Sequence, residues 1–367
     1  PTILTSLNYF WKIIANYSDL ELAYGCNYLS LEDIIYKAGQ MDVKSYMAIA
    51  SNSPELTNEK TNLSRHLAQR FLIPYIIGFG SNILNIELFK FFKLINFIFI
   101  IIYLTVIIVY LKLSSFNFWS SLIFYSLLTL NPYIVRSHLF QPVQIHDIIF
   151  YTISIIFTIC LFRKKYLVLI GINFFSIFLR QTSIAFNIAM FIYFIKNKKI
   201  VYLLSQLILF FISFYLISFF SNFYSVEKFK FNYAYGIINY DFSNTARLFK
   251  FMLLPFVSFF PLFIFFYSQI IRNKIIEFEN ILLLFICLMM IAQPILAGPD
   301  GSDRNVVRIT TLCYPILLIV FFRIFDLSRF LKNRIAIIIY LIGLHLWSLH
   351  PTFSKIKIFD FLRFSLN

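Results

Sequence analysis

The chain has few charged residues for its length: Asp, Glu, Lys and Arg make up only 13% of its 367 residues. Hydrophobic residues make up 60%, and the mean hydropathy is +0.78. A soluble domain usually has about 25% charged and about 45–50% apolar residues. This balance argues against a soluble domain and indicates a chain whose natural solvent is lipid.

Several sequence motifs that are typical of soluble enzymes and metal-binding domains are missing from the sequence. Its four cysteines lie far apart and show neither a metal-ligand spacing nor the pattern of a disulfide framework. The sequence has no glycine-rich phosphate loop, no dinucleotide-binding fingerprint and no Gly-x-Ser-x-Gly elbow. Chemistry on soluble nucleotides therefore has no recognisable motif here.

The formal net charge of +15 does not indicate a nucleic-acid partner. The basic residues occur singly or in short clusters between apolar runs, which is how membrane proteins mark their cytoplasmic loops. The 48 Phe and 23 Tyr, together with abundant Ile, Lys and Asn, form a composition typical of an AT-rich genome. We therefore do not interpret aromatic stripes as binding sites.

Long apolar runs predict an all-α, polytopic membrane protein. The run at 94–111 is uncharged over 18 residues, enough to cross most of a hydrocarbon core of about 30 Å. Nine more runs follow, at 118–132, 148–162, 166–179, 184–195, 200–221, 251–271, 281–297, 309–322 and 335–349. We predict about ten transmembrane helices within 93–350, an external or interfacial helical region at 1–92 and an interfacial tail at 351–367. Because the chain begins with Pro1, an N-terminal helix is expected to be missing.

Basic clusters predict the orientation. Short loops rich in Lys and Arg stay in the cytoplasm, and such clusters occur at 163–165, 196–199, 272–274 and 323–334. Residues 1–92 are then outside, with the loops 133–147, 222–250 and 298–308. Fourteen of the 17 acidic residues fall on this outer side. The expected location is a bacterial inner membrane, with an active site facing outward.

The only long polar segment, residues 39–74, comes just before the first clear span. It contains the run Asp-x-x-x-Tyr-x-x-x-Ala-x-x-x-Pro, formed by Asp42, Tyr46, Ala50 and Pro54, and then the pair Arg70 and Pro74. These motifs resemble the first external loop of bacterial polytopic glycosyltransferases of the GT-C class, in which D-G-x-x-Y-x-x-x-A-x-x-P precedes R-x-L-x-P. Val43 and Lys44 stand where many members have Gly and Gln, which leaves the substrate open.

The resemblance implies an integral membrane glycosyltransferase, of the inverting type, that moves a sugar from a polyprenyl-phosphate donor to an extracytoplasmic lipid, glycan or protein. Its partners are that lipid-linked sugar and membrane lipids, with no nucleic acid, and a divalent cation stays open as cofactor. Such a reaction needs a carboxylate base and cations for the departing phosphate. Asp42 is assigned as the base, and the phosphate partners as Arg70, Arg180, Arg304 and Arg308. The substrate-binding candidates are Tyr46, His66, Gln69, Asp147 and Gln181.

Arg180 interrupts a run that must cross the membrane twice, because cytoplasmic clusters bound residues 166–195 on both sides. Fourteen helical residues span only about 21 Å, so Arg180 is expected at or slightly below the outer interface. There it either faces a cavity, where it binds phosphate, or snorkels to the interface. Some GT-C enzymes have a similar Arg-Gln-Thr element, which favours phosphate binding.

Two further outer loops supply candidates with open alternatives. Asp147 either binds a substrate hydroxyl or a divalent ion, or caps the helix that starts at Ile148. His138 and His146 show no familiar metal-ligand spacing, and no metal site is predicted. In the loop 298–308, glycine and proline predict tight turns before Arg304 and Arg308, which lie one helical turn apart and suit a phosphate. The alternative there is a surface ion pair with Asp303.

Two other functional classes remain as alternatives. A surface-polysaccharide polymerase or ligase shares the polytopic body and the outer arginines, but places its large polar loop late in the chain. A lipid or solute transporter needs a path through the membrane, whereas intramembrane ionisable residues are scarce here and no internal repeat is visible. For Asp42, a role as a helix N-cap also stays open.

The charge clusters generate a prediction about topology. Ser302→Cys is expected to react with an impermeant thiol reagent from outside intact cells, because residues 298–308 form an outer loop. Asn197→Cys, within a basic cytoplasmic cluster, is expected to react only after permeabilisation. Equal labelling of the two variants in intact cells would contradict the orientation.

Overall fold

The structure, a computed structural model, describes residues 41–56, 63–140, 142–225, 251–252, 259–265, 277–302, 306–325 and 327–348. Residues 1–45 and 46–367 form two compact units. Residues 46–92, predicted as part of an external region, thus belong to the same unit as the long apolar helices. Within the described ranges every assigned element is a helix, which confirms the all-α class.

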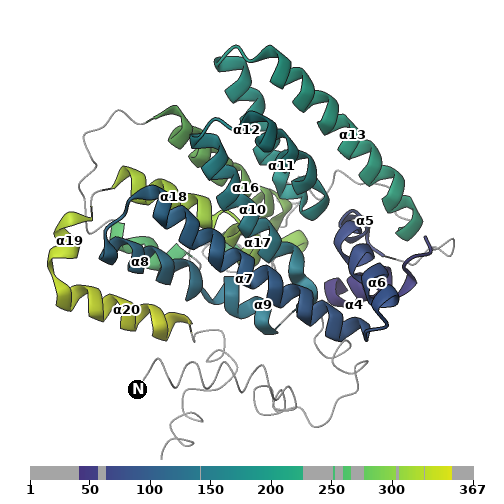
Figure 1. The fold of residues 1–367 in the computed structure, drawn as a ribbon, viewed down its shortest axis with the longest axis horizontal. Coiled ribbons are helices and arrows are strands. Elements are labelled where there is room, and N and C mark those ends of the chain that lie inside the picture. The colour runs from purple at the N-terminus through teal and green to yellow at the C-terminus, as the bar shows by residue number, and fades with distance from the viewer. Residues whose placement is uncertain are drawn as a thin grey trace, which may run out of the picture. The chain divides into compact units, whose positions relative to one another are not determined.

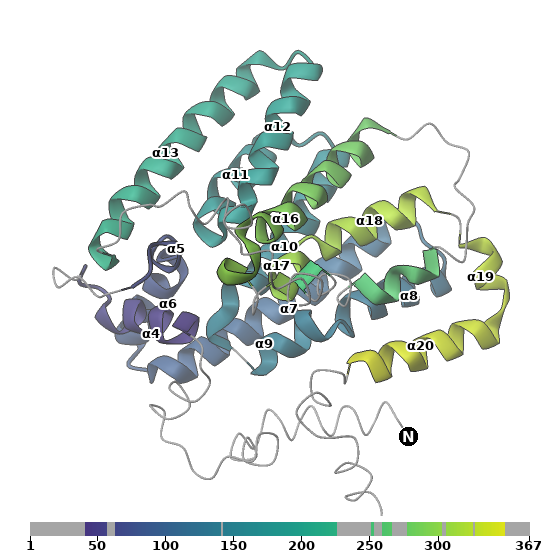
Figure 2. The same cartoon turned by 180° about the vertical axis from the view of Figure 1, so that it is seen from behind.

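Figures 1 and 2 show the helices from opposite sides. In chain order they are α4 (Met41–Asn52), α5 (Arg65–Ala68), α6 (Leu72–Leu84), α7 (Leu88–Ser114), α8 (Phe118–Thr129), η2 (Pro132–Arg136), α9 (Ser137–Phe140), η3 (Pro142–Gln144), α10 (Ile145–Phe162), α11 (Tyr166–Leu179), η4 (Gln181–Ser183), α12 (Ile184–Lys196), α13 (Ile200–Tyr224), η6 (Phe260–Phe263), α16 (Phe278–Ser302), α17 (Val306–Thr311), α18 (Tyr314–Ile324), α19 (Ser328–Lys332) and α20 (Arg334–Ser348).

Five of these helical stretches are long and apolar enough to cross a membrane: Leu88–Ser114, Phe118–Val135, Pro142–Phe162, Ile200–Tyr224 and Phe278–Ala297. Four shorter apolar helices are Leu72–Leu84, Tyr166–Leu179, Tyr314–Ile324 and Arg334–Ser348. These lengths and compositions support a membrane protein. Of the predicted run at 251–271, residues 253–258 and 266–271 lie outside the described part of the chain.

Helix α10 is the central helix of the second unit. It contacts α7, α11, α16 and α18, and 13 of its 18 residues are buried. Its buried serine and threonine hydroxyls are satisfied within the helix, since Thr152, Ser154 and Thr158 each donate to the carbonyl one turn before. Asp147 lies in the first turn of α10 and is buried with the rest of the helix.

Helix α7 has one buried face and one exposed face, and both are largely apolar. Its buried residues recur every three or four positions, which places them on one side of the helix: Phe92, Asn96, Ile100, Tyr103, Ile107 and Tyr110. The exposed residues between them are also apolar, including Leu94, Ile98 and Ile108. In water such a face would be unfavourable, whereas in a bilayer it is the expected one.

The predicted helical hairpin is present, with Arg180 at its turn. Helix α11 ends at Leu179, Arg180 adopts an extended backbone, and η4 leads into α12. Buried amides join these helices to α13, because Asn173 donates to Gln206 and Gln206 donates to Asn187. The hairpin is therefore tied together in its interior, which fixes the position of its turn.

Close packing of α4 on α6 depends on Gly78. A Cβ atom at this position would lie 2.0 Å from the carbonyl oxygen of Ala50, which is itself buried. Only glycine allows the two backbones to approach so closely. Ala50 of the Asp-Tyr-Ala-Pro run is thus a packing residue, and Tyr46 lies one turn before it on α4.

One predicted turn is wrong. The sequence analysis placed tight turns at Gly298, Pro299 and Gly301, but α16 continues as a helix through all three to Ser302. A proline is tolerated in such a helix when the backbone carbonyl that it leaves unpaired finds another partner. Residues 303–305, including Asp303 and Arg304, lie outside the described residues.

The packing at Gly78 makes a prediction about stability. Gly78→Ala is expected to destabilise the protein by about 1–3 kcal/mol, because its Cβ meets backbone that cannot move away freely. Gly171→Ala on α11 is the matched control, since a Cβ there has nothing within 4 Å. Thermal unfolding in detergent compares the two, and equal melting temperatures would contradict the predicted α4–α6 contact.

Candidate functional site

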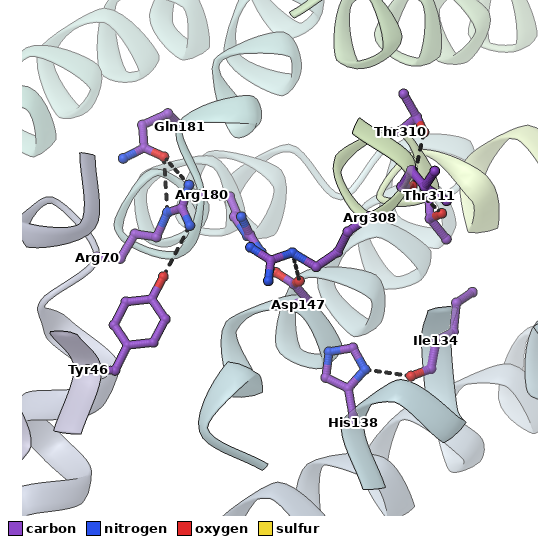
Figure 3. A network of polar contacts seen from close by, with 11 residues as sticks. Tyr46, Arg70, Ile134, His138, Asp147, Arg180, Gln181, Arg308, Thr310 and Thr311 are labelled. Carbon is purple, nitrogen blue, oxygen red and sulfur yellow. Dashed lines mark hydrogen bonds and ion pairs between the residues drawn. The ribbon is translucent and has the colours of Figure 1, made fainter. Parts of the chain in front are cut away.

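Two arginines from distant segments face one buried carboxylate, that of Asp147, and a third arginine lies beside them (Figure 3). Asp147 Oδ1 accepts a hydrogen bond from Arg180 Nη2, and Oδ2 lies 3.6 Å from Arg308 Nε of α17. Arg70, which follows α5, also acts electrostatically on Arg180. We call Arg70, Arg180 and Arg308 the arginine cluster.

Arg70 is buried, with 8% of its surface exposed, and the partners found for it are neutral. Its Nε and Nη2 atoms donate to Gln181 Oε1 at 3.1 and 2.9 Å, and Nη1 donates to Tyr46 Oη at 3.1 Å. A guanidinium removed from water is costly unless an anion compensates it. Neutral acceptors hold Arg70 in place but leave its charge without a counter-ion among these partners.

Gln181 is the residue that holds Arg70. Its Nε2 atom donates to the carbonyl oxygen of His66 at 2.8 Å and to Gln69 Oε1 at 3.0 Å, while its Oε1 atom accepts from Arg70 twice. These four bonds use all of the hydrogen-bonding capacity of a carboxamide. Gln181 therefore positions Arg70 in this structure, and its predicted contact with the substrate stays a prediction.

The described side chains of the cluster include three guanidinium groups and one carboxylate. Burial lowers the pKa of Arg180, and the nearby Arg70 and Arg308 lower it further, while Asp147 opposes them. The three arginines therefore repel one another, and an anion bound among them would be stabilised.

His138 presents a neutral imidazole of fixed tautomer. Its pKa is lowered mainly by burial, an effect to which Arg308 and Arg180 add and which Asp147 opposes. Because Nδ1 bonds to the carbonyl oxygen of Ile134, Nδ1 carries the proton and Nε2 carries a lone pair. Figure 3 shows Nε2 on the side of the ring away from Ile134. That lone pair has no partner among the described residues.

More unpartnered polar atoms lie around His138. The Tyr151 ring is 6.0 Å from the His138 ring, and the Tyr103 ring is 6.3 Å from that of Tyr151. Asn96 Nδ2 donates to the His138 carbonyl oxygen. Both tyrosine hydroxyls and Asn96 Oδ1 lack a partner among the described residues. We call His138, Tyr151, Tyr103 and Asn96 the α7–α10 polar cluster, and each such buried atom costs about 1–3 kcal/mol if nothing satisfies it.

The fold brings most of the predicted site residues together. Seven of the ten contact one another through side chains in this region: Tyr46, Gln69, Arg70, Asp147, Arg180, Gln181 and Arg308. His66 contributes its backbone carbonyl, while its side chain is exposed. Arg304 and the side chain of Asp42 lie outside the described residues, although the backbone of Asp42 is helical.

The structure also decides between alternatives left open by the sequence. Asp147 is not an N-cap, because Gln144 precedes α10 and Asp147 lies inside its first turn. Asp42 lies within α4 and is likewise not an N-cap. Arg180 is 3% exposed and ion-paired, so it does not snorkel to the surface. No group of three or more His, Cys, Asp or Glu able to hold a metal occurs among the described residues.

Tyr103 and Tyr151 were missed as candidates. Both lie within apolar helices of a chain rich in aromatics, where their spacing resembles that of the packing residues around them. One feature of the sequence could have identified Tyr151 as a candidate: it follows Asp147 by four positions and therefore lies on the same face of α10.

The arginine cluster predicts a large cost for removing its carboxylate. Asp147→Asn is expected to destabilise the protein by about 3–5 kcal/mol, because the buried guanidinium group of Arg180 loses its counter-charge. The exposed pair of Glu87 and Lys90 offers a control, since Glu87→Gln should leave the unfolding midpoint nearly unchanged. Adding Arg180→Met to Asp147→Asn should recover part of the loss. Unfolding midpoints in detergent measure this, and additive effects would contradict the coupling.

Known proteins do not place the chain in a family. Comparisons with protein-family models, with curated proteins and with solved structures gave no match. The roles of the residues therefore rest on this chain's own geometry and chemistry, and the resemblance to GT-C glycosyltransferases stays a prediction.

Proposed function

We propose that the protein is an integral membrane glycosyltransferase that takes a sugar from a polyprenyl-phosphate donor and passes it to an extracytoplasmic acceptor. The observation that carries this proposal is the arginine cluster, in which the buried Arg70 is held by the neutral side chains of Gln181 and Tyr46, within a chain of apolar helices. The Asp-Tyr-Ala-Pro run and the Arg70–Pro74 pair, which resemble those of GT-C enzymes, support the same function. The proposed topology has about ten spans, with the site facing the outside of a bacterial inner membrane.

A lipid-borne phosphate fits the chemistry of the cluster. Guanidinium groups bind phosphate oxygens through paired, charge-assisted hydrogen bonds. The donor is a phosphodiester with one negative charge, and transfer releases a phosphate monoester, whose charge is about −1.5 to −2 near neutral pH. Guanidinium groups therefore stabilise the phosphate more strongly as its negative charge grows during transfer. Such preferential stabilisation of the transition state is what catalysis requires.

The base in this proposal is Asp42. Asp147 is an unsuitable base, because both of its oxygens face guanidinium groups that stabilise the ionised carboxylate. The resemblance assigns the base to the carboxylate that begins the Asp-Tyr-Ala-Pro run, and Tyr46 of that run bonds directly to Arg70. Asp42 and Arg70 thus belong to the same polar segment of the sequence, residues 39–74.

A second candidate function is binding or translocation of an anionic lipid without chemical transfer. The observation that favours it is that the only carboxylate described at the cluster, Asp147, is ion-paired to arginine. Both functions need the phosphate site, and only the transferase needs a base.

Two variants test the proposal and separate the two functions. Arg70→Ala should weaken binding of undecaprenyl phosphate about 10- to 150-fold, because a charge-assisted hydrogen bond contributes about 1.5–3 kcal/mol. Asp42→Asn should bind that lipid normally but release polyprenyl phosphate from its glycosylated form at least about a hundredfold more slowly. Native mass spectrometry measures the binding, and lipid extracts of membranes measure the release.

Arg65→Ala is the control for Arg70→Ala, since Arg65 bonds to Asn222 and Ser218 of α13 and not to the cluster. Unchanged lipid affinity in Arg70→Ala would overturn the phosphate site. Normal release in Asp42→Asn would exclude Asp42 as the base, and absence of release in the wild type would leave only the binding function.

A further inference from the structure

The α7–α10 polar cluster lies next to the arginine cluster but shares no residue with it. Tyr151 and Asp147 are four residues apart on α10, so their side chains leave the helix on the same face. His138 lies edge-on to Tyr151, with ring centroids 6.0 Å apart. The charges of Asp147, Arg180 and Arg308 all act on His138, which places the imidazole within electrostatic range of the phosphate site.

The unpartnered atoms of this cluster define what it can bind. His138 Nε2 and Asn96 Oδ1 accept hydrogen bonds, while the Tyr151 and Tyr103 hydroxyls accept or donate them. His138, Tyr151, Tyr103 and Asn96 are each at least nine-tenths buried. Buried polar atoms in native proteins nearly always have a partner, so a bound molecule or ordered water is required.

The chemistry of these atoms excludes two kinds of occupant. An apolar lipid tail would leave every one of them unsatisfied. An anion would face two acceptors, His138 Nε2 and Asn96 Oδ1, that have no proton to offer it. A molecule with several hydroxyl groups matches all four atoms, because each hydroxyl both donates and accepts.

We propose that the α7–α10 polar cluster binds the hydroxyl groups of the sugar whose phosphate lies on the arginine cluster, with His138 Nε2 and the Tyr151 hydroxyl as the contacts. This inference rests on the proposed function, since it assigns the sugar part of the same donor. The cluster then selects a glycosylated lipid phosphate over the bare lipid phosphate, whereas the arginine cluster binds both.

Two different substitutions at His138 test the roles of its Nδ1 and Nε2 atoms one at a time. Asn at this position keeps an amide N–H near Nδ1, where it donates to Ile134, but removes the acceptor at Nε2. Gln instead reaches the position of Nε2 with an amide oxygen that accepts. Tyr151→Phe removes one hydroxyl and keeps the ring. His345→Asn, at an exposed histidine of α20, and Tyr193→Phe, at the end of α12 away from Arg180, are the matched controls.

The measurement is the ratio of glycosylated to bare polyprenyl phosphate that co-purifies with each variant, determined by mass spectrometry of the extracted lipids. His138→Asn and Tyr151→Phe should each lower this ratio at least about fivefold while total polyprenyl phosphate stays near the wild-type amount. His138→Gln should recover part of the loss, and both controls should match the wild type.

Three outcomes would overturn the inference, and they are distinguishable. If the wild type and His138→Asn carry the same ratio, the cluster does not contact the sugar, while the phosphate site stands. If the wild type retains only bare polyprenyl phosphate, water fills the cluster, and again the phosphate site stands. If the wild type retains no polyprenyl lipid at all, the proposed function fails and this inference fails with it.

Discussion

The site depends on one interaction: the carboxylate of Asp147 holds Arg180 and Arg308 together inside the protein. Buried charges are tolerated only when they are paired and hydrogen-bonded, so each partner requires the others. The pairing also joins three segments that are distant in sequence, namely the first turn of α10, the turn of the α11–α12 hairpin, and α17. Arg70 and Arg308 both act electrostatically on Arg180, so the pairing brings several positive charges close together, which links the fold to its proposed ligand.

The surrounding helices hold Asp147 and the arginines in place. Helix α10 is buried on most sides, which keeps Asp147 away from water, and the amides of Asn173, Gln206 and Asn187 fix the hairpin that carries Arg180. Gln181 Oε1 then accepts two hydrogen bonds from Arg70, while its Nε2 atom donates to Gln69 Oε1 and to the His66 carbonyl oxygen. The guanidinium groups are therefore positioned before any ligand arrives, and preorganised donors of this kind stabilise developing charge most effectively. The α7–α10 polar cluster adds acceptors and hydroxyls on the next turn of the same helix.

The sequence predicted much of this arrangement. The apolar runs predicted the helices, because lipid-facing and core-facing residues are both hydrophobic and the runs are therefore continuous. The basic clusters around residues 166–195 predicted the hairpin and placed Arg180 at its turn. Asp147 was proposed because it lies at the outer end of a predicted span, Arg308 because it follows Arg304 by one helical turn, and Arg70 because its spacing to Pro74 resembles that of GT-C enzymes.

Other features were beyond the sequence. The pairing of Asp147 with Arg180 and Arg308 depends on tertiary packing, and no local spacing encodes it. Gln181 was assigned to the substrate because a linear motif cannot show that its amide is already saturated. The helical path through Gly298 and Pro299 was missed because these residues usually favour turns, whereas here the apolar helix α16 continues through them. Tyr151 was missed because an aromatic residue in an apolar helix looks like packing.

The central claim is that the arginine cluster binds the phosphate of a polyprenyl lipid. The most direct test is an experimental structure of the protein in a lipid nanodisc with bound undecaprenyl phosphate. The account predicts phosphate oxygens within hydrogen-bonding distance of the Arg70 and Arg180 guanidinium groups. A lipid phosphate bound elsewhere, with Arg70 still bonded only to Gln181 and Tyr46, would contradict it.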